Sequence, residues 1–133
     1  MRLLLDTHAL IWFTTDSRRL PTTLVEQFAD VANTLCVSRI SLLEMAIKSQ
    51  LAKADFPLVF EQWLTRFQQF DFELLEIHDN HLVQLSQLPT VKDHRDPFDR
   101  LLIAQALTEN LTLVSCDGKF ASYAAAGLHT RWS

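Results

Sequence analysis

Residues 2–13, RLLLDTHALIWF, predict a short buried strand that leads through one acidic residue into a helix. Further apolar runs of strand length occur at residues 35–38 (LCVS), 72–77 (FELLEI) and 111–114 (LTLV), and residues 128–131 (LHTR) are a candidate for a short fifth strand. Helices are predicted after Asp6, Pro21, residue 39, Pro57, residue 81 and Pro97. Short apolar strands that alternate with amphipathic helices favour a parallel sheet covered on both faces. We therefore predict a three-layer α/β/α fold with a central parallel sheet of four to five strands.

The composition excludes several classes of protein. The chain has 133 residues, 48% of them apolar and 21% charged, so we expect residues 1–133 to form a single globular domain. The net charge of −4 excludes a polycation that coats nucleic acid without specificity. No uncharged stretch approaches the ~18 residues of a membrane span. With only two glycines, the chain contains neither GxGxxG nor a P-loop.

Both cysteines, Cys36 and Cys116, lie within apolar segments. We interpret them as core residues of a protein in a reducing compartment, which places the protein in the cytoplasm. A zinc site is not expected, because the sequence has no CxxC or HxxxH spacing.

Four acidic residues occupy related places in the predicted fold. Asp6 and Asp117 directly follow the first and fourth strands, whereas Glu44 and Asp99 lie in the first turns of two predicted helices. In a parallel α/β sheet, strand ends and the N-termini of the crossover helices meet at the same edge, where ligands bind. We therefore expect all four acids to project from one rim.

Each acid also has a structural interpretation, as a helix cap or a first-turn residue. These alternatives are Asp6 and Asp117 as N-caps, Ser41–Glu44 as an S-x-x-E capping box, and Asp96–Asp99 as an N-cap with Asp at N3. Capping does not explain why all four positions are acidic. Two carboxylates ~5 Å apart repel by about 3 kcal/mol at an effective dielectric near 20, so converging acids need a cation. Oxygen ligands favour Mg²⁺ or Mn²⁺, which activate water and hold a phosphodiester.

Four segments resemble the PIN domain, a family of metal-dependent ribonucleases: LLLDTHALIW (3–12), SRISLLEMAIK (38–48), HRDPFDRLLIAQA (94–106) and TLVSCDGKF (112–120). The DPFDR signature is similar to that of VapC-type toxins of bacterial toxin–antitoxin pairs. The resemblance implies a PIN-like fold and a metal-binding, catalytic quartet made of Asp6, Glu44, Asp99 and Asp117. It further implies hydroxyl assistance from Thr7 and Ser115, Mg²⁺- or Mn²⁺-dependent cleavage of single-stranded RNA, a homodimer, and inhibition by a small cognate antitoxin.

Basic residues close to the acids in sequence are either phosphate contacts or ordinary solvated charge: Arg39, Lys48, Arg95, Arg100 and Lys119. His94 either tunes protonation beside the acids or is a polar loop residue, and we favour the latter. Residues 40–51 are predicted to form a helix with Ile40, Leu43, Ala46, Ile47 and Leu51 on one face. With residues 57–69 they are also expected to present an apolar groove for an antitoxin helix, and Trp63 either lines this groove or belongs to the core.

Two rival functions remain open from the sequence. A receiver-like signalling domain also has an acidic rim on a five-stranded parallel sheet. It needs a phospho-accepting Asp after the third strand, and here that strand ends at Glu76-Ile77-His78; nor does a Lys follow the fifth strand. A catalytically silent PIN-like domain that only binds partners is the second rival, although all four acids are intact.

Overall fold

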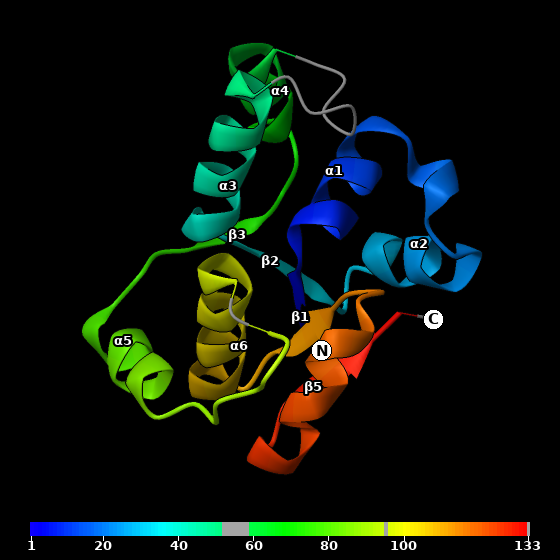
Figure 1. Cartoon of the computed structure of the whole chain (residues 1–133). Coiled ribbons are helices and arrows are strands. Elements are labelled where there is room, and N and C mark those ends of the chain that lie inside the picture. Colours follow the sequence, from blue (N-terminus) through cyan, green and yellow to red (C-terminus); the bar gives the residue numbers. More distant parts are fainter. Residues whose placement is uncertain (52–58, 95, 133) are drawn as a thin grey trace.

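The computed structural model describes residues 1–51, 59–94 and 96–132. A five-stranded parallel sheet forms the centre of the molecule, in the order β3-β2-β1-β4-β5 (Figure 1). The strands are β1 Arg2–Leu5, β2 Thr34–Ser38, β3 Glu73–Leu75, β4 Thr112–Val114 and β5 His129–Arg131. The helical elements are α1 Thr7–Thr15, η1 Ser17–Arg19, α2 Thr22–Ala29, α3 Arg39–Gln50, α4 Phe60–Phe67, α5 Asp79–Ser86, α6 Pro97–Glu109 and η2 Gly118–Ala126.

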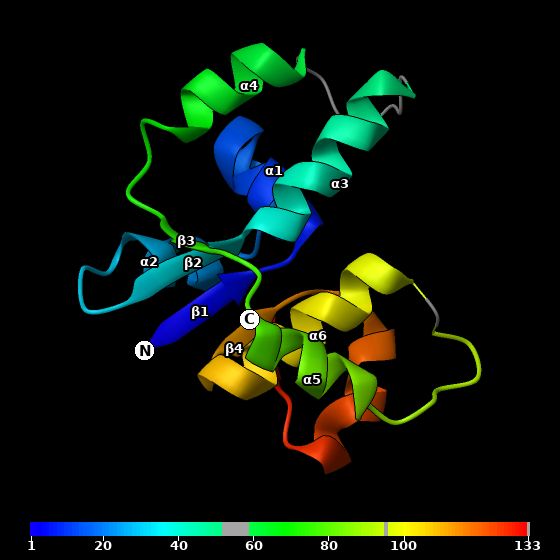
Figure 2. The same ribbon diagram turned by 90° about the vertical axis from the view of Figure 1, so that its left-hand side faces the viewer.

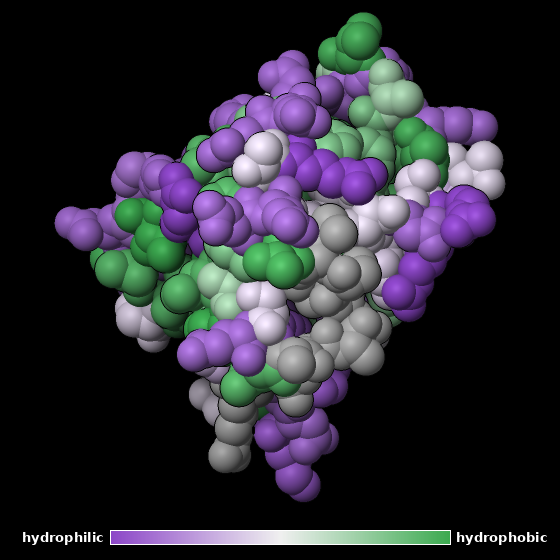
Figure 3. Space-filling model, turned by 90° about the horizontal axis from the view of Figure 1, so that it is seen from above, coloured by the Kyte–Doolittle hydropathy of each residue, from purple (hydrophilic) through white to green (hydrophobic). Residues whose placement is uncertain are grey.

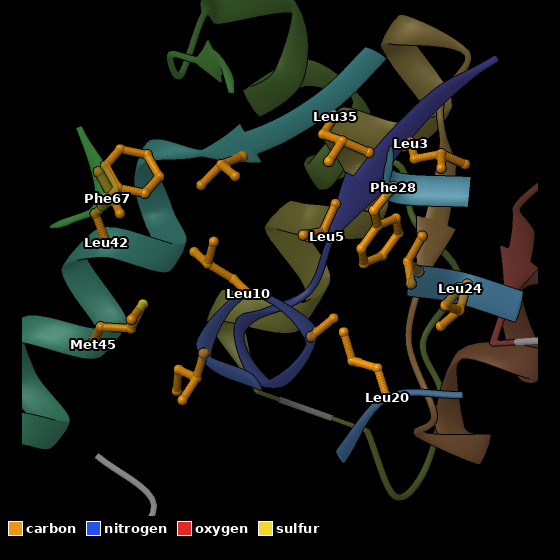
Figure 4. Close-up of a cluster of buried hydrophobic side chains, with 14 of the residues drawn as sticks. Leu3, Leu5, Leu10, Leu20, Leu24, Phe28, Leu35, Leu42, Met45 and Phe67 are labelled. Carbon is orange, nitrogen blue, oxygen red and sulfur yellow. The ribbon is translucent and has the colours of Figure 1, made fainter. Parts of the chain in front are cut away.

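Helices cover both faces of the sheet, which confirms the predicted three-layer fold. Figure 2 shows α1, α3 and α4 on one side and α5 and α6 on the other. Because side chains alternate along a strand, Leu3 and Leu5 pack into one apolar cluster while Leu4 packs into a second. Figure 4 shows the first cluster, in which these strand residues meet Leu10, Leu24 and Met45 from the covering helices.

The strand order reverses between β1 and β4. The chain adds β2 and β3 outward on one side of β1, and then returns to add β4 and β5 on the other side. In open α/β sheets, ligands bind outside the carboxyl ends of the strands at such a reversal. The order also differs from the 2-1-3-4-5 arrangement of receiver domains, so the topology argues against the receiver-like alternative.

The start of α3 differs from the prediction. Its N-cap is Ser38, whose hydroxyl accepts a hydrogen bond from the backbone N–H of Ile40 at 3.1 Å. The predicted Ser41–Glu44 capping box was wrong, because the helix begins at Arg39, directly after β2, so that Ser41 lies inside its first turn and Glu44 beyond it. Among the described residues, the buried Ser41 hydroxyl finds no hydrogen-bond partner.

The apolar residues of α3 divide between the core and the surface. Leu43, Ile47 and Leu51, which were predicted to share one helical face with Ile40, are 50%, 40% and 61% exposed. The core contacts come instead from Ile40, Leu42 and Met45. Sequence periodicity does not show which face of α3 is buried, because the helix carries apolar residues on more than one side.

The structure also decides between the alternatives for Trp63, corrects the expectation for Cys116 and adds one element. Trp63 cannot line an exposed groove, because it is fully buried and its indole N–H donates to the Thr14 hydroxyl at 2.8 Å. Cys36 is buried as predicted, but Cys116 is exposed at the end of the sheet. Element η2 was not predicted. Pro57, expected to open a helix, lies outside the described residues. No helix among the described residues is long and apolar enough to cross a membrane.

Candidate metal-dependent active site

A cavity of about 410 Å³ lies at the carboxyl edge of the sheet, beyond the ends of β1 and β4. Its lining includes all four acids that the sequence singled out, namely Asp6, Glu44, Asp99 and Asp117. Asp6 and Asp117 follow the two neighbouring strands, while Glu44 and Asp99 are carried by α3 and α6. The fold thus brings four acids from distant parts of the sequence to one cavity.

Asp6 is deeply buried, with only 6% of its surface exposed. It caps α1, and its Oδ1 atom accepts a hydrogen bond from the Ala9 N–H at 2.8 Å. Burial raises the pKa of Asp6 above its ordinary value, because the carboxylate loses water. A hydrogen bond with Ser115, the Ala9 N–H and the charge of His8 oppose this rise in pKa, whereas the charge of Asp99 adds to it.

Glu44 has both carboxylate oxygens engaged. The Thr7 hydroxyl donates to Oε1 at 2.6 Å, and the Lys48 ammonium contacts Oε2 at 2.6 Å. Lys48 lies one helical turn after Glu44 on α3. The lysine is therefore the cation that neutralises this buried carboxylate in the structure.

Asp99 occupies the N3 position of α6 and is partly buried. Burial is the main cause that raises the pKa of its carboxyl group, and the charges of Asp96 and Glu44 raise it further. The His94 ring, which lies 3.1 Å from Oδ2 of Asp99, works in the opposite direction. Asp6 and Glu44 each interact electrostatically with Asp99, so the three acids form one coupled group.

The prediction that His94 is an ordinary polar loop residue was wrong. It is only 2% exposed, and its ring packs edge-on against Phe120 and Tyr123 at centroid distances of 5.5 and 5.4 Å. Both aromatic residues belong to η2, the element that the sequence analysis missed. The sequence indicates a role for His94 at the site only through its position beside the acidic motif, because the residues that bury the His94 ring lie far away in sequence.

Asp96 and Asp117 act as exposed helix caps at the rim. Asp96 Oδ1 accepts from the backbone N–H groups of Phe98 and Asp99 at 2.8 and 3.3 Å, as predicted for an N-cap. Asp117 Oδ1 accepts from the N–H of Lys119 at 2.9 Å and caps η2. Capping therefore coexists with a position on the cavity wall.

The five basic candidates divide into three groups. Lys48 and Lys119 line the cavity. Arg39 instead pairs with a carboxylate after β3 at 2.8 Å, and Arg100 donates to a tyrosine hydroxyl and a backbone carbonyl. Arg95 lies outside the described residues. The positive charge at the cavity that the described residues provide for a phosphate therefore comes from the two lysines.

The donor set of the cavity fits a divalent cation of the Mg²⁺ type. Within residues 1–51, 59–94 and 96–132, no three His, Cys, Asp or Glu side chains are already arranged as metal ligands. The available donors are nevertheless carboxylate and hydroxyl oxygens, which Mg²⁺ and Mn²⁺ prefer. The raised pKa values of Asp6 and Asp99 show that burial and mutual repulsion disfavour their charged forms. A divalent cation would relieve that repulsion.

A second cavity, of about 520 Å³, lies at the opposite edge of the sheet, where β2 and β3 begin. Its walls include several phenylalanine rings and three acids, Asp30, Asp71 and Glu73, of which Glu73 is paired with Arg2 at 2.7 Å. This larger cavity lies away from the strand reversal, at the end of the sheet where the strands begin. The cavity at the carboxyl edge is therefore the better candidate for chemistry.

Comparisons with known proteins agree with this geometry. The sequence model of the PIN domain matches residues 3–126. No curated protein sequence matches the chain. Similar solved structures include VapBC2 from Rickettsia felis bound to a promoter DNA fragment (TM-score 0.72, 21% identity, 98% of each chain covered).

Two further structures share the fold at low identity. They are VapBC-1 from nontypeable Haemophilus influenzae (TM-score 0.73, 17% identity, 98% of this chain and 97% of that chain covered) and VapBC-5 from Mycobacterium tuberculosis, described as a member of a toxin–antitoxin family (TM-score 0.60, 18% identity, 98% and 95% covered). The family match extends over nearly the whole length, from β1 to the end of η2. The chain belongs to the PIN domain family.

Proposed function

We propose that the chain is a Mg²⁺- or Mn²⁺-dependent endoribonuclease and the toxin of a type II toxin–antitoxin pair. The observation that carries the nuclease proposal is the gathering of Asp6, Glu44, Asp99 and Asp117 around one cavity at the strand reversal. The toxin proposal is supported by the similarity to solved structures named as VapBC, one of them described as a toxin–antitoxin system.

In this proposal the four acids hold the cation, and their neighbours orient them. Thr7 fixes one oxygen of Glu44, and the Ala9 N–H and Ser115 hold Asp6. When bound, the cation supplies an activated water and neutralises charge on the phosphodiester. Because the acids themselves are held by the protein, they need little reorganisation to receive it.

The lysines at the cavity are proposed to hold the phosphates of the RNA. Lys119 follows the cap residue Asp117, and Lys48 reaches the cavity from α3. Lys48 pairs with Glu44 in this structure, and it becomes available for a phosphate once Glu44 has a metal partner. These contacts let an acidic chain bind an anionic substrate at one place.

An antitoxin helix is proposed to pack on the exposed apolar side of α3. Leu43, Ile47 and Leu51 recur every four residues, which places them on one helical face. Val59, just before α4, is also 65% exposed. Figure 3, which views the molecule from above, shows green hydrophobic side chains set among hydrophilic ones on the face in view. Such a stripe suits an amphipathic partner helix, and dimerisation of the chain is a further part of the proposal.

The test of the nuclease proposal uses the purified chain, freed of any bound antitoxin. Single-stranded RNA should be cut in Mg²⁺ or Mn²⁺ and remain whole in Ca²⁺ or EDTA, and duplex DNA should stay intact. Asp6→Asn should abolish cleavage, because it removes a charged metal ligand. Asp71→Asn is the matched control. Asp71 is exposed at the opposite cavity, so this variant should cut RNA at the wild-type rate.

Two results would count against the proposal. Cleavage that persists at full rate in Asp6→Asn would indicate a contaminating nuclease. A folded, antitoxin-free chain that cuts no RNA from a total-RNA pool in any of these ions would favour the catalytically silent alternative.

A further inference from the structure

Three side chains, two of them buried, form a hydrogen-bonded chain that ends on Asp99. The Arg100 guanidinium donates to the Tyr123 hydroxyl oxygen at 2.9 Å and to the Pro89 carbonyl at 3.1 Å. The Tyr123 hydroxyl lies 2.9 Å from Nδ1 of His94, and Nε2 of His94 lies 3.1 Å from Oδ2 of Asp99. Tyr123 is fully buried, and His94 nearly so.

The direction of these hydrogen bonds follows from the two ends of the chain. A guanidinium only donates, and an ionised carboxylate only accepts. Nε2 of a neutral His94 must therefore carry the ring proton that it donates to Asp99. Nδ1 is then the acceptor, and it takes the hydroxyl proton of Tyr123, whose oxygen already accepts from Arg100. The network thus assigns a single tautomer to His94.

We propose that Arg100, Tyr123 and His94 form a positioning relay that fixes the Asp99 carboxylate for the divalent cation; this inference rests on the proposed function. His94 holds Oδ2 of Asp99, and the aromatic rings of η2 hold His94. Metal-binding side chains are oriented by such outer hydrogen bonds, whose removal typically lowers metal affinity or activity by 10–100-fold. None of the three relay residues needs to touch the substrate.

The relay also gives η2 a role at the cavity. This element begins at its cap, Asp117, and buries Phe120 and Tyr123 against the region of His94. One short segment therefore carries one acid of the cavity and positions another. It does so through Tyr123, which lies 29 residues from His94 in sequence.

The central test is Tyr123→Phe, which keeps the ring and removes the hydroxyl. The matched control is Thr14→Val, which removes a buried hydroxyl that accepts from Trp63 on the other face of the sheet. Mn²⁺ affinity of each full-length protein is measured by calorimetric titration, and thermal unfolding in EDTA verifies that each variant is folded. Tyr123→Phe should weaken Mn²⁺ binding by about 10–100-fold, whereas Thr14→Val should leave it within about twofold of wild type.

Two further readouts separate positioning from general stability. In ¹⁵N NMR spectra of the metal-free protein, wild-type His94 should show a proton on Nε2, and Tyr123→Phe should give a mixture of tautomers. Replacing His94 by Gln retains an amide donor that reaches as far as Nε2, so His94→Gln should keep more Mn²⁺ affinity than His94→Leu. RNA cleavage by Tyr123→Phe should recover toward the wild-type kcat as Mn²⁺ is raised.

The outcomes distinguish the relay from the proposed function. Equal Mn²⁺ affinity in wild type and Tyr123→Phe, or a proton on Nδ1 of wild-type His94, would overturn the relay alone. Wild-type protein that binds Mn²⁺ and cuts no RNA would overturn the ribonuclease function and leave the relay supported by the affinity ratio. Wild-type protein that binds no Mn²⁺ would overturn both.

Discussion

Replacing Asp99 by Asn should separate metal binding from helix capping within a single motif. The pKa of Asp99 is raised mainly by burial, with added repulsion from Asp96 and Glu44 that the His94 hydrogen bond only partly offsets. Each unit of such a rise corresponds to about 1.4 kcal/mol in favour of the neutral form. Asn is neutral and can still accept from His94, although it loses ~0.3–1 kcal/mol of favourable interaction with the helix dipole.

The metal-free Asp99→Asn protein should therefore be as stable as wild type, or more stable by on the order of 1 kcal/mol. That difference corresponds to a melting temperature higher by roughly 3–5 °C in a chain of this length. Cleavage of RNA in Mg²⁺ should be abolished, because a charged ligand is gone. Thermal unfolding in EDTA and cleavage assays in Mg²⁺ measure the two effects separately.

Asp96→Asn is the control in the same helix turn. Asp96 is exposed, and Asn is as good an N-cap as Asp, so the bonds to the Phe98 and Asp99 N–H groups should survive. Its stability should change by less than about 0.5 kcal/mol, and activity should fall only modestly. An inactive Asp96→Asn beside an active Asp99→Asn would show that the ligand has been assigned to the wrong residue. A metal-free Asp99→Asn much less stable than wild type would refute the argument from repulsion.

The remaining predictions concern metal, pH, the lysine and the partner surface. Mg²⁺ or Mn²⁺ should raise the melting temperature, because at 100 times the Kd the bound ion stabilises the fold by about 2.7 kcal/mol. A melting temperature that changes with neither the ions nor EDTA would contradict the site. Because the folded pKa values of Asp6 and Asp99 are raised, these two carboxyl groups bind protons more tightly in the metal-free fold than in the unfolded chain. Urea unfolding in EDTA should then show wild type losing stability relative to Asp6→Asn and Asp99→Asn as pH rises from about 4 through these pKa values; a gain relative to both variants in that window would refute the assignment. Lys48→Met should tighten Mn²⁺ binding by calorimetry and raise the KM for RNA, and unchanged values of both would remove the lysine from the site. Ile47→Glu should weaken antitoxin binding in a pull-down while leaving the melting temperature nearly unchanged, whereas Trp63→Ala should destabilise the fold by about 3–5 kcal/mol.

Local sequence features predicted the site residues that lie where a strand ends or a helix begins. Asp6 and Asp117 are visible because each ends an apolar strand, and Asp99 because Asp96-Pro97 marks a helix start. The common edge then follows from the geometry of parallel α/β sheets. The fold class was predictable for the same reason, since strands buried on both faces are continuously apolar.

The errors arise where tertiary contacts decide between equal local options. Ser38 and Ser41 are both possible caps, and only the immediate junction of β2 with α3 selects Ser38. His94 lies in a charged stretch that looks solvated, and no local pattern connects it with Tyr123. Trp63 fits a partner groove by composition, but the hydroxyl of Thr14 from a distant helix satisfies its indole inside the core.

Capping and the proposed metal binding are not rival explanations for these acids, because one carboxylate can serve both roles. The Ala9 N–H holds one oxygen of Asp6, the Lys119 N–H holds one oxygen of Asp117, and both carboxylates still line the cavity. A held carboxylate has fewer orientations to lose when it binds a cation, so each cap also preorganises a ligand. Glu44 differs, because it lies inside α3 where no backbone N–H is free, and Thr7 and Lys48 hold it instead. Since Lys48 is a cation on a flexible stem, Glu44 is the proposed ligand at which a metal ion would have to replace an existing partner. Metal binding at Glu44 should therefore depend on Lys48, whose ammonium competes with the cation for this carboxylate.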